Sequence, residues 1–158
     1  VDVLVFDHHK SVPLYYDKQF AVVSQDMPSL VVESKMQLNK ASFRDAIDNI
    51  CSVKRLNHEI TGIIWGYSGL TFKILKNHLL TFGDDIVHKH MPDCIFNFDR
   101  GFVVVKLSPD GDDNYKWALL EEKTDLAKIL IQRILYSADV ENLKPYIAEI
   151  EIPMDVKF

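Results

Sequence analysis

Residues 29–38 read Ser-Leu-Val-Val-Glu-Ser-Lys-Met-Gln-Leu, and this stretch decides which fold the chain can adopt. The run is apolar and rich in β-branched residues, Pro28 precedes it and Asn39 follows it, so it predicts a buried strand. Two opposite charges, Glu33 and Lys35, interrupt the apolar run. The function of the chain therefore depends on whether these two side chains only pair with each other or take part in a site.

The alternation of side chains along a strand places both charges on the same face. One face carries Val31, Glu33, Lys35 and Gln37, and the other carries Leu30, Val32, Ser34 and Met36. A carboxylate and an ammonium are costly to bury in an apolar strand unless they pair or bind something else. Two interpretations follow: a salt-bridged pair on a half-solvated strand, or a metal-binding carboxylate beside a catalytic lysine. Because Glu-x-Lys is common, the surrounding sequence has to decide between them.

The composition indicates one soluble globular domain. The chain has 158 residues, of which 47% are hydrophobic and 26% charged. No apolar run approaches the roughly 20 residues of a membrane-spanning helix, and no signal peptide is visible. Cys51 and Cys94 are too few for a disulfide scaffold or a Cys-rich zinc site, which favours the reducing cytoplasm. The net charge of −5 argues against a broad basic surface for nucleic acid, although it allows a small basic cleft.

The elements around this strand predict an α/β domain. Residues 1–7 form a strand candidate whose face with Asp2 also carries Leu4 and Phe6, and residues 20–24 are a second, short one. Residues 39–56 predict an amphipathic helix, with Ser42 and Asp45 making a capping-box-like start. An apolar strand over residues 60–67 follows. Strand, helix and strand in this order predict a crossover between parallel strands.

The second half of the chain predicts further elements and no separate domain. They are a helix over 70–82, a hairpin of strands 94–98 and 102–107, a strand over 115–120, a helix over 124–137 and an edge strand over 150–152. No internal repeat or linker interrupts the sequence. One α/β domain is the simplest account.

The order of these motifs resembles the PD-(D/E)xK nuclease superfamily, and in particular an uncharacterised bacterial branch of it. The similarity lies in Asp2 leading a strand, Glu33-x-Lys35 on a later strand, and the amphipathic helix and apolar strand that follow. Residues 91–96 and the turn 99–101 also look familiar from that branch, and the resemblance covers the first two thirds of the chain well. It implies a restriction-endonuclease-like α/β fold, with a central mixed β-sheet flanked by helices.

The sequence departs from the family pattern at three points. Val1 stands where the motif name puts proline, and Ser34 stands where an apolar residue is usual. The helix that precedes the motif in the family is not within residues 1–158. We therefore expect a single nuclease-like domain over 1–158 that lacks an upstream N-terminal helix.

The resemblance implies roles for four residues. Asp2, Glu33, Lys35 and Gln37 correspond to the catalytic residues. The carboxylates of Asp2 and Glu33 and the backbone carbonyl of Ser34 would hold Mg²⁺ or Mn²⁺. Lys35 would orient or deprotonate the attacking water and offset phosphate charge, and Gln37 lies on the same face for contact with water or substrate.

The function implied is metal-dependent endonucleolytic hydrolysis of nucleic-acid phosphodiesters, with DNA favoured over RNA and a role in bacterial defence or DNA processing. Many enzymes of this fold act as dimers, so the resemblance allows a homodimer. The main alternative is a catalytically inactive interaction domain that keeps the nuclease fold. The net negative charge of the chain and the missing helix favour this alternative. A second is an enzyme of another class whose pocket lies near Trp65, Tyr67 or His90.

Other polar clusters are better explained as ordinary surface or core. Adjacent residues of a strand point in opposite directions, so His8 and His9 beside Asp7 do not share a metal easily. The histidines at 78, 88 and 90 have no carboxylate or cysteine pattern around them, so a structural zinc is not expected. The scattered glycines form no phosphate-binding loop, and residues 110–114 lack the spacing of a calcium loop.

Overall fold

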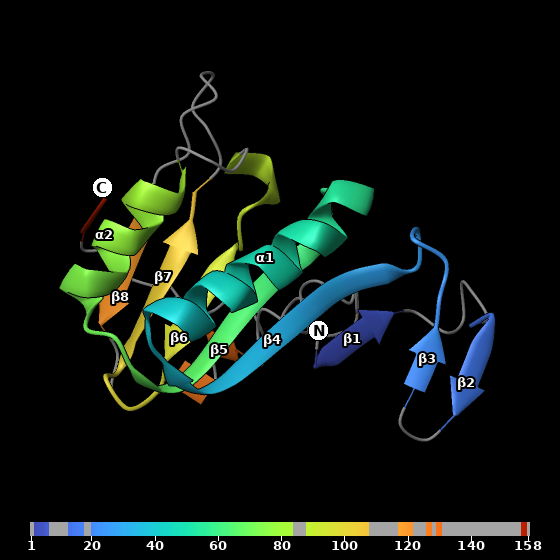
Figure 1. Ribbon diagram of the computed structural model, residues 1–158, viewed down its shortest axis with the longest axis horizontal. Helices are drawn as coiled ribbons and strands as arrows, with labels where there is room; N and C mark the ends of the chain where they lie inside the picture. The colour runs from blue at the N-terminus through green and yellow to red at the C-terminus, as the bar shows by residue number, and fades with distance from the viewer. Residues whose placement is uncertain are drawn as a thin grey trace, which may run out of the picture.

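The computed structural model describes residues 2–6, 13–17, 20–83, 88–107, 117–121, 126–127, 129–130 and 156–157. Its described strands form a seven-stranded sheet in the order β1-β4-β5-β6-β7-β8-β9, with β2 and β3 in a separate two-stranded sheet (Figure 1). The strands are β1 (Val3–Phe6), β2 (Tyr15–Asp17), β3 (Phe20–Val22), β4 (Pro28–Leu38), β5 (Thr61–Gly69), β6 (Cys94–Asn97), β7 (Phe102–Lys106), β8 (Trp117–Glu121) and β9 (Val156–Lys157). The helical elements are α1 (Lys40–Leu56), α2 (Phe72–Gly83) and the 3₁₀ turn η1 (His88–His90).

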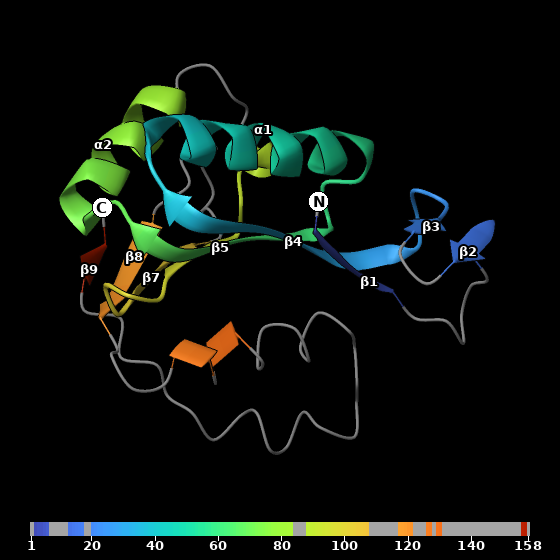
Figure 2. The same cartoon turned by 60° about the horizontal axis from the view of Figure 1, so that its bottom comes forward.

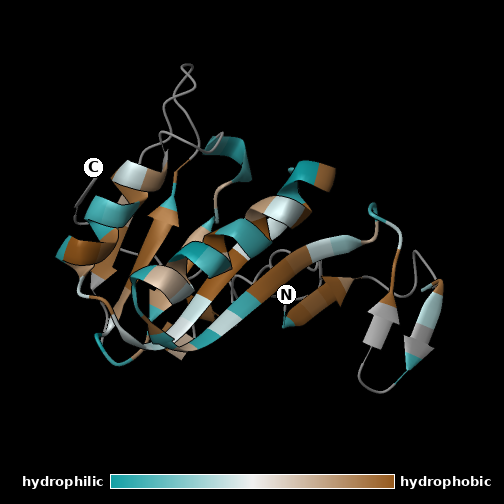
Figure 3. Ribbon diagram, viewed as in Figure 1, coloured by the Kyte–Doolittle hydropathy of each residue, from teal (hydrophilic) through white to brown (hydrophobic). Residues whose placement is uncertain are grey.

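The long strand β4 lies second from one edge of the sheet, between β1 and β5. It pairs antiparallel with β1 and parallel with β5, and α1 makes the connection between the two parallel strands. The predicted alternation is confirmed, because Val31 packs on the face covered by α1 and Leu30 packs on the other, both fully buried. Figure 3 shows the consequence, since β4 is pale where it begins, brown over the stretch that follows, and teal and pale toward its end. The polar residues of β4 therefore gather beyond the apolar core.

The predicted range of α1, 39–56, is confirmed to within one residue, but the capping box predicted at Ser42 and Asp45 lies one turn earlier. Asn39 is the N-cap, and its side-chain oxygen accepts a hydrogen bond from the Ser42 backbone N–H at 3.0 Å. The Ser42 hydroxyl in turn accepts from the Asn39 backbone N–H at 2.9 Å, which closes a capping box. Asn39 can cap because its backbone is extended where β4 ends, whereas Ser42 already lies inside the helix.

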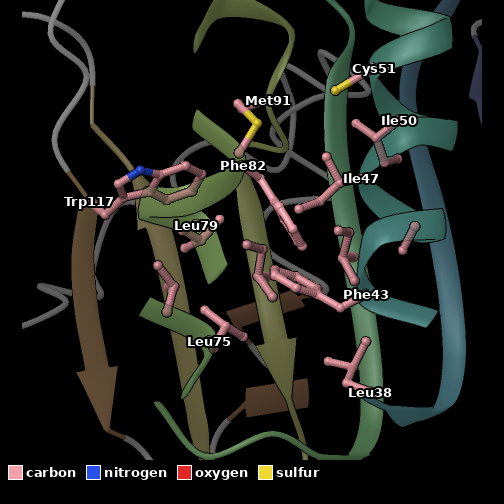
Figure 4. Packing of buried hydrophobic residues seen from close by; sticks show 14 of the residues in the cluster. Leu38, Phe43, Ile47, Ile50, Cys51, Leu75, Leu79, Phe82, Met91 and Trp117 are labelled. Atoms are coloured by element: carbon pink, nitrogen blue, oxygen red, sulfur yellow. The ribbon is translucent and has the colours of Figure 1, made fainter. Parts of the chain in front are cut away.

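Two hydrophobic layers sandwich the sheet. Helices α1 and α2 lie on one face, and the short helical pieces at 126–127 and 129–130 lie on the other (Figure 2). Figure 4 shows the first layer, where Phe43 and Ile47 of α1 meet Leu75 and Leu79 of α2 above the sheet. Buried apolar surface of this extent is the dominant stabilising term of a domain. It fixes α1 against β4.

Most other predicted elements are confirmed with shifted bounds. β1 is shorter than the predicted strand over 1–7, β8 begins two residues later than expected, and the hairpin of β6 and β7 is antiparallel as predicted. Strand β2 was not predicted; it pairs with β3 to form a hairpin set apart from the sheet in Figure 1. Much of the helix predicted over 124–137, and all of 150–152, lie outside the described residues. None of the described helices is long and apolar enough to span a membrane.

A buried charged group, here called the Asp93 cluster, joins α1 to the sheet. The Asp93 carboxylate forms ion pairs with Lys54 of α1 and, at 2.9 Å, with Lys106 of β7. It also accepts a hydrogen bond from the Gly62 backbone N–H at 2.7 Å. Both lysine side chains are almost completely buried, with 2% and 7% of their surfaces exposed. One carboxylate therefore neutralises charge on two elements that are distant in sequence.

Candidate active site

The antiparallel pairing of β1 with β4 brings Asp2 beside Ser34. The Asp2 backbone N–H donates to the Val32 carbonyl at 3.0 Å, just beyond the end of β1. Its carboxylate oxygen Oδ2 accepts from the Ser34 backbone N–H at 2.6 Å and from the Ser34 hydroxyl at 2.8 Å. The serine at this position, which departs from the family pattern, therefore has a defined role here: its hydroxyl holds the aspartate.

The strand pairing also brings Asp2 close in space to the motif on β4. Val3 pairs with Val32, and Asp2 comes one residue earlier, just beyond the end of β1. Its carboxylate contacts Ser34, the residue between Glu33 and Lys35. Asp2 and the motif, more than 30 positions apart in the sequence, thus meet at this edge of the sheet.

Glu33 and Lys35 form an ion pair at the edge of the core. The Lys35 Nζ donates to Glu33 Oε1 at 2.7 Å, and the glutamate is buried whereas 26% of the lysine side chain is exposed. Burial of a carboxylate is costly unless opposite charge and hydrogen bonds compensate it. The half-exposed lysine provides that compensation and still reaches solvent.

Hydrogen bonding and nearby charge shift the pKa values of two of these groups. The Ser34 backbone and hydroxyl donors lower the pKa of Asp2, and Lys35 contributes to the same shift. The hydrogen bond to Glu33 raises the pKa of Lys35, and the charges of Glu33, Asp2 and Asp45 act in the same direction against a smaller effect of burial. At neutral pH Asp2 is therefore an anion and Lys35 a cation.

Asn49 also belongs to this site, although its sequence position did not indicate it. Asn49 lies on α1, and its Nδ2 donates to the same Glu33 oxygen at 2.9 Å. Ala46 and Ile50, three residues before it and one after it, are fully buried against the sheet. Asn49 itself is exposed at the border of this apolar face, so in the sequence it looks like an ordinary surface residue, and its partner cannot be read from spacing alone.

The remaining predicted residues lie away from this geometry. Gln37 lies farther along β4 and is exposed. His78 stacks on Phe82 in the core layer, and His88 and His90 belong to η1 instead of a strand. The segment with Asp7, His8 and His9 lies outside the described residues.

Two of the residues named for a rival pocket, Trp65 and Tyr67, pack against the same phenylalanine, Phe98. Trp65 packs against Phe96 and Phe98, and Tyr67 stacks on Phe98. Trp65 belongs with the core layer opposite α1. These side chains lie on the face of the sheet that does not carry Glu33.

The oxygen donors at this site suit a hard divalent cation. In the part of the chain that the structure describes, no three His, Cys, Asp or Glu side chains group so as to hold a metal ion. The ligand set implied by the family resemblance has two carboxylates, Asp2 and Glu33, and one backbone carbonyl, that of Ser34. The Ser34 N–H donates to Asp2, so the backbone of this residue lies next to one of the two carboxylates. Carboxylate and carbonyl oxygens are the ligands that Mg²⁺ and Mn²⁺ prefer.

The basic residues of α1 do not form one free cationic face. Lys54 is buried in the Asp93 cluster, and Arg44 pairs with Asp48 at 3.1 Å and lies over the Phe82 ring. Lys40 and Arg55 are exposed at the two ends of the helix. Of the cations described near the motif, Lys35 is the one that the ion pair with Glu33 holds at the site itself.

The chain resembles known proteins in structure but matches no family by sequence. No family model and no curated protein matches the chain. The structure is similar to that of NucC from P. aeruginosa ATCC27853 in its cAAA-bound form, with a TM-score of 0.62, 14% identity, and coverage of 92% of this chain and 70% of that one. The structure is also similar to that of NucC from E. coli MS115-1 in its cAAA-bound form. Here the TM-score is 0.57 and the identity 13%, and the match covers 91% of this chain and 68% of that one. The predicted restriction-endonuclease-like α/β fold is confirmed by this likeness.

Proposed function

We propose that this domain is a metal-dependent nuclease that hydrolyses phosphodiester bonds of nucleic acid, with DNA favoured over RNA. The observation that carries the proposal is the meeting of Asp2 with the Glu33-Ser34-Lys35 segment through the β1–β4 pairing. This meeting occurs in a restriction-endonuclease-like fold. Fold alone does not define activity, so the proposal rests on this site.

Asp2, Glu33 and the Ser34 carbonyl would hold Mg²⁺ or Mn²⁺. A carboxylate has about four lone-pair sites, so the two hydrogen bonds accepted by Glu33 Oε1 are compatible with a role as metal ligand. The low pKa of Asp2 keeps its carboxylate ionised at neutral pH, as a metal ligand must be. When bound, such an ion supplies Lewis-acid stabilisation of phosphate charge and a more acidic water.

Lys35 serves as a cation and not as the general base. Its raised pKa keeps the ammonium protonated throughout the neutral range, where it has no free lone pair to accept a proton. The exposed quarter of its side chain lets the ammonium reach a phosphate oxygen and offset its charge. Of the two roles expected for this lysine, orientation and charge compensation therefore fit the geometry. Gln37, exposed farther along β4, is proposed to contact the water or the substrate strand.

The direct test is a cleavage assay with the purified chain. Double-stranded DNA, single-stranded DNA and RNA are incubated with Mg²⁺, Mn²⁺ or EDTA, using wild type, Lys35→Ala and the control Lys73→Ala. Lys73 is an exposed lysine of α2, on a different element from the site. We expect metal-dependent cutting, fastest on DNA, which Lys35→Ala slows by about 100-fold or more because transition-state charge is left uncompensated. Lys73→Ala should cut at the wild-type rate.

Two results would contradict the proposal. One is the absence of cutting by wild type with every substrate and metal. The other is cutting that survives EDTA or is equally fast in Lys35→Ala. Light scattering on the same preparation measures whether the chain is a homodimer, which we propose by analogy with the fold.

A further inference from the structure

We propose that Asn49 is a positioning residue that holds the Glu33 carboxylate in the orientation needed to bind a divalent cation. This inference rests on the proposed nuclease function and deepens it. Asn49 Nδ2 donates to Glu33 Oε1 at 2.9 Å from the middle of α1, 16 residues along the chain. The helix thereby contributes to a site whose other members all lie on β1 and β4 or next to them.

The two donors to Glu33 differ in what they can do during a reaction. Lys35 is charged, half-exposed and on a flexible stem, so it can leave Glu33 for a phosphate oxygen. Asn49 is neutral and short, and it lies in the middle of the regular helix α1, next to the fully buried Ile50. When Lys35 turns to the substrate, the asparagine amide still fixes the carboxylate.

The neutral charge of Asn49 suits this role. A second cation at this position would hold Glu33 equally well, but it would also repel the metal ion that the carboxylate is to bind. An amide N–H fixes the oxygen while leaving the negative charge of the carboxylate in place. Outer hydrogen bonds of this kind orient metal ligands, and their loss weakens metal affinity by about 10- to 100-fold.

A purely structural role explains the contact less well. α1 is already fixed to the sheet by Phe43, Ala46, Ile47 and Ile50, each fully buried. One further hydrogen bond at the border of this layer adds little to that attachment. The residue that gains most from the bond is Glu33, because its carboxylate is buried and Oε1 accepts hydrogen bonds from both Lys35 and Asn49.

The test measures metal binding apart from catalysis. Isothermal titration with Mn²⁺ is performed on wild type, Asn49→Ala and the control Asn77→Ala, an exposed asparagine in the middle of α2. We expect Asn49→Ala to bind Mn²⁺ about 10- to 100-fold more weakly. Asn77→Ala should bind as wild type does, and thermal melting should show all three folded. In the cleavage assay, the KM for DNA should stay unchanged, and the lost rate of Asn49→Ala should return at saturating Mn²⁺.

Several outcomes would overturn the positioning role. They are wild-type Mn²⁺ affinity in Asn49→Ala, tighter Mn²⁺ binding in Asn49→Asp, which would place residue 49 among the ligands themselves, and no Mn²⁺ binding by wild type at millimolar concentration. If wild type binds Mn²⁺ but cuts no substrate, the proposed nuclease function fails and the titration alone still decides the role of Asn49.

Discussion

Replacing Glu33 by glutamine will reduce metal-dependent cleavage by at least about 1,000-fold, the scale expected when a group that acts in the reaction is removed. Glutamine keeps the size of the side chain but removes the charge that binds a metal ion and the ion pair that holds Lys35 at 2.7 Å. The protein should remain folded, because the freed lysine is already partly exposed and can be solvated.

The measurement compares initial rates at saturating Mg²⁺ and DNA, together with DNA affinity by fluorescence anisotropy. The matched control is Glu59→Gln, a glutamate exposed after α1, which should cut as wild type does. Removal of a ligand should lower the rate and leave DNA affinity within a few-fold. A Glu33→Gln protein that retains a tenth of the wild-type rate would exclude Glu33 from the catalytic site.

Replacing Asp93 by asparagine will lower the free energy of unfolding by about 3–5 kcal/mol, the cost of leaving buried charges without their partner. The substitution removes the one carboxylate that both Lys54 and Lys106 contact in the Asp93 cluster. Asp48→Asn is the control, because it breaks the exposed Arg44 pair on the same helix and should cost less than about 1 kcal/mol. Urea unfolding followed by circular dichroism measures both differences.

The deficit of Asp93→Asn should shrink as the pH rises toward 10. Burial lowers the pKa of Lys54 even with Asp93 present, and loss of that carboxylate lowers it further. The unfolded chain then binds more protons than the folded one between the lowered pKa and the ordinary value of about 10.4, so stability increases with pH across that window. A deficit that is constant from pH 7 to 10 would show that Lys54 does not carry the effect.

The sequence predicted the central strand well because its pattern depends on local rules. The alternation of side chains between the two faces of residues 29–38 required only strand geometry, and the charges of Glu33 and Lys35 stood out in an apolar run. Asp2 could be joined to them only through a family resemblance, since its contact with Ser34 depends on a pairing between distant segments. The helix cap at Asn39 was missed by one turn because several polar residues near that boundary can cap.

The least predictable residues are those whose role depends on how α1 is rotated over the sheet. Asn49 meets Glu33 and Lys54 meets Asp93 from the same helix, yet both look like ordinary surface residues in the sequence. A lysine near the end of a helix is typically solvated, whereas Lys54 is 2% exposed. Buried polar partners are set by tertiary packing, which periodicity alone does not resolve.

Because Asp2 adjoins the edge strand β1, it can leave the site while the rest of the domain stays folded. β1 has four residues, pairs with β4 alone among the described strands and is mostly half-buried, so it is expected to detach locally long before the core opens. Amide hydrogen exchange should then be faster in β1 than in β5 or β6. Each such opening removes Asp2 from Ser34 while Glu33 and Lys35 stay in place. The fraction of time that Asp2 spends beside Ser34 therefore depends on the local stability of one short strand. A bound strand of substrate or protein can change that fraction without altering the core.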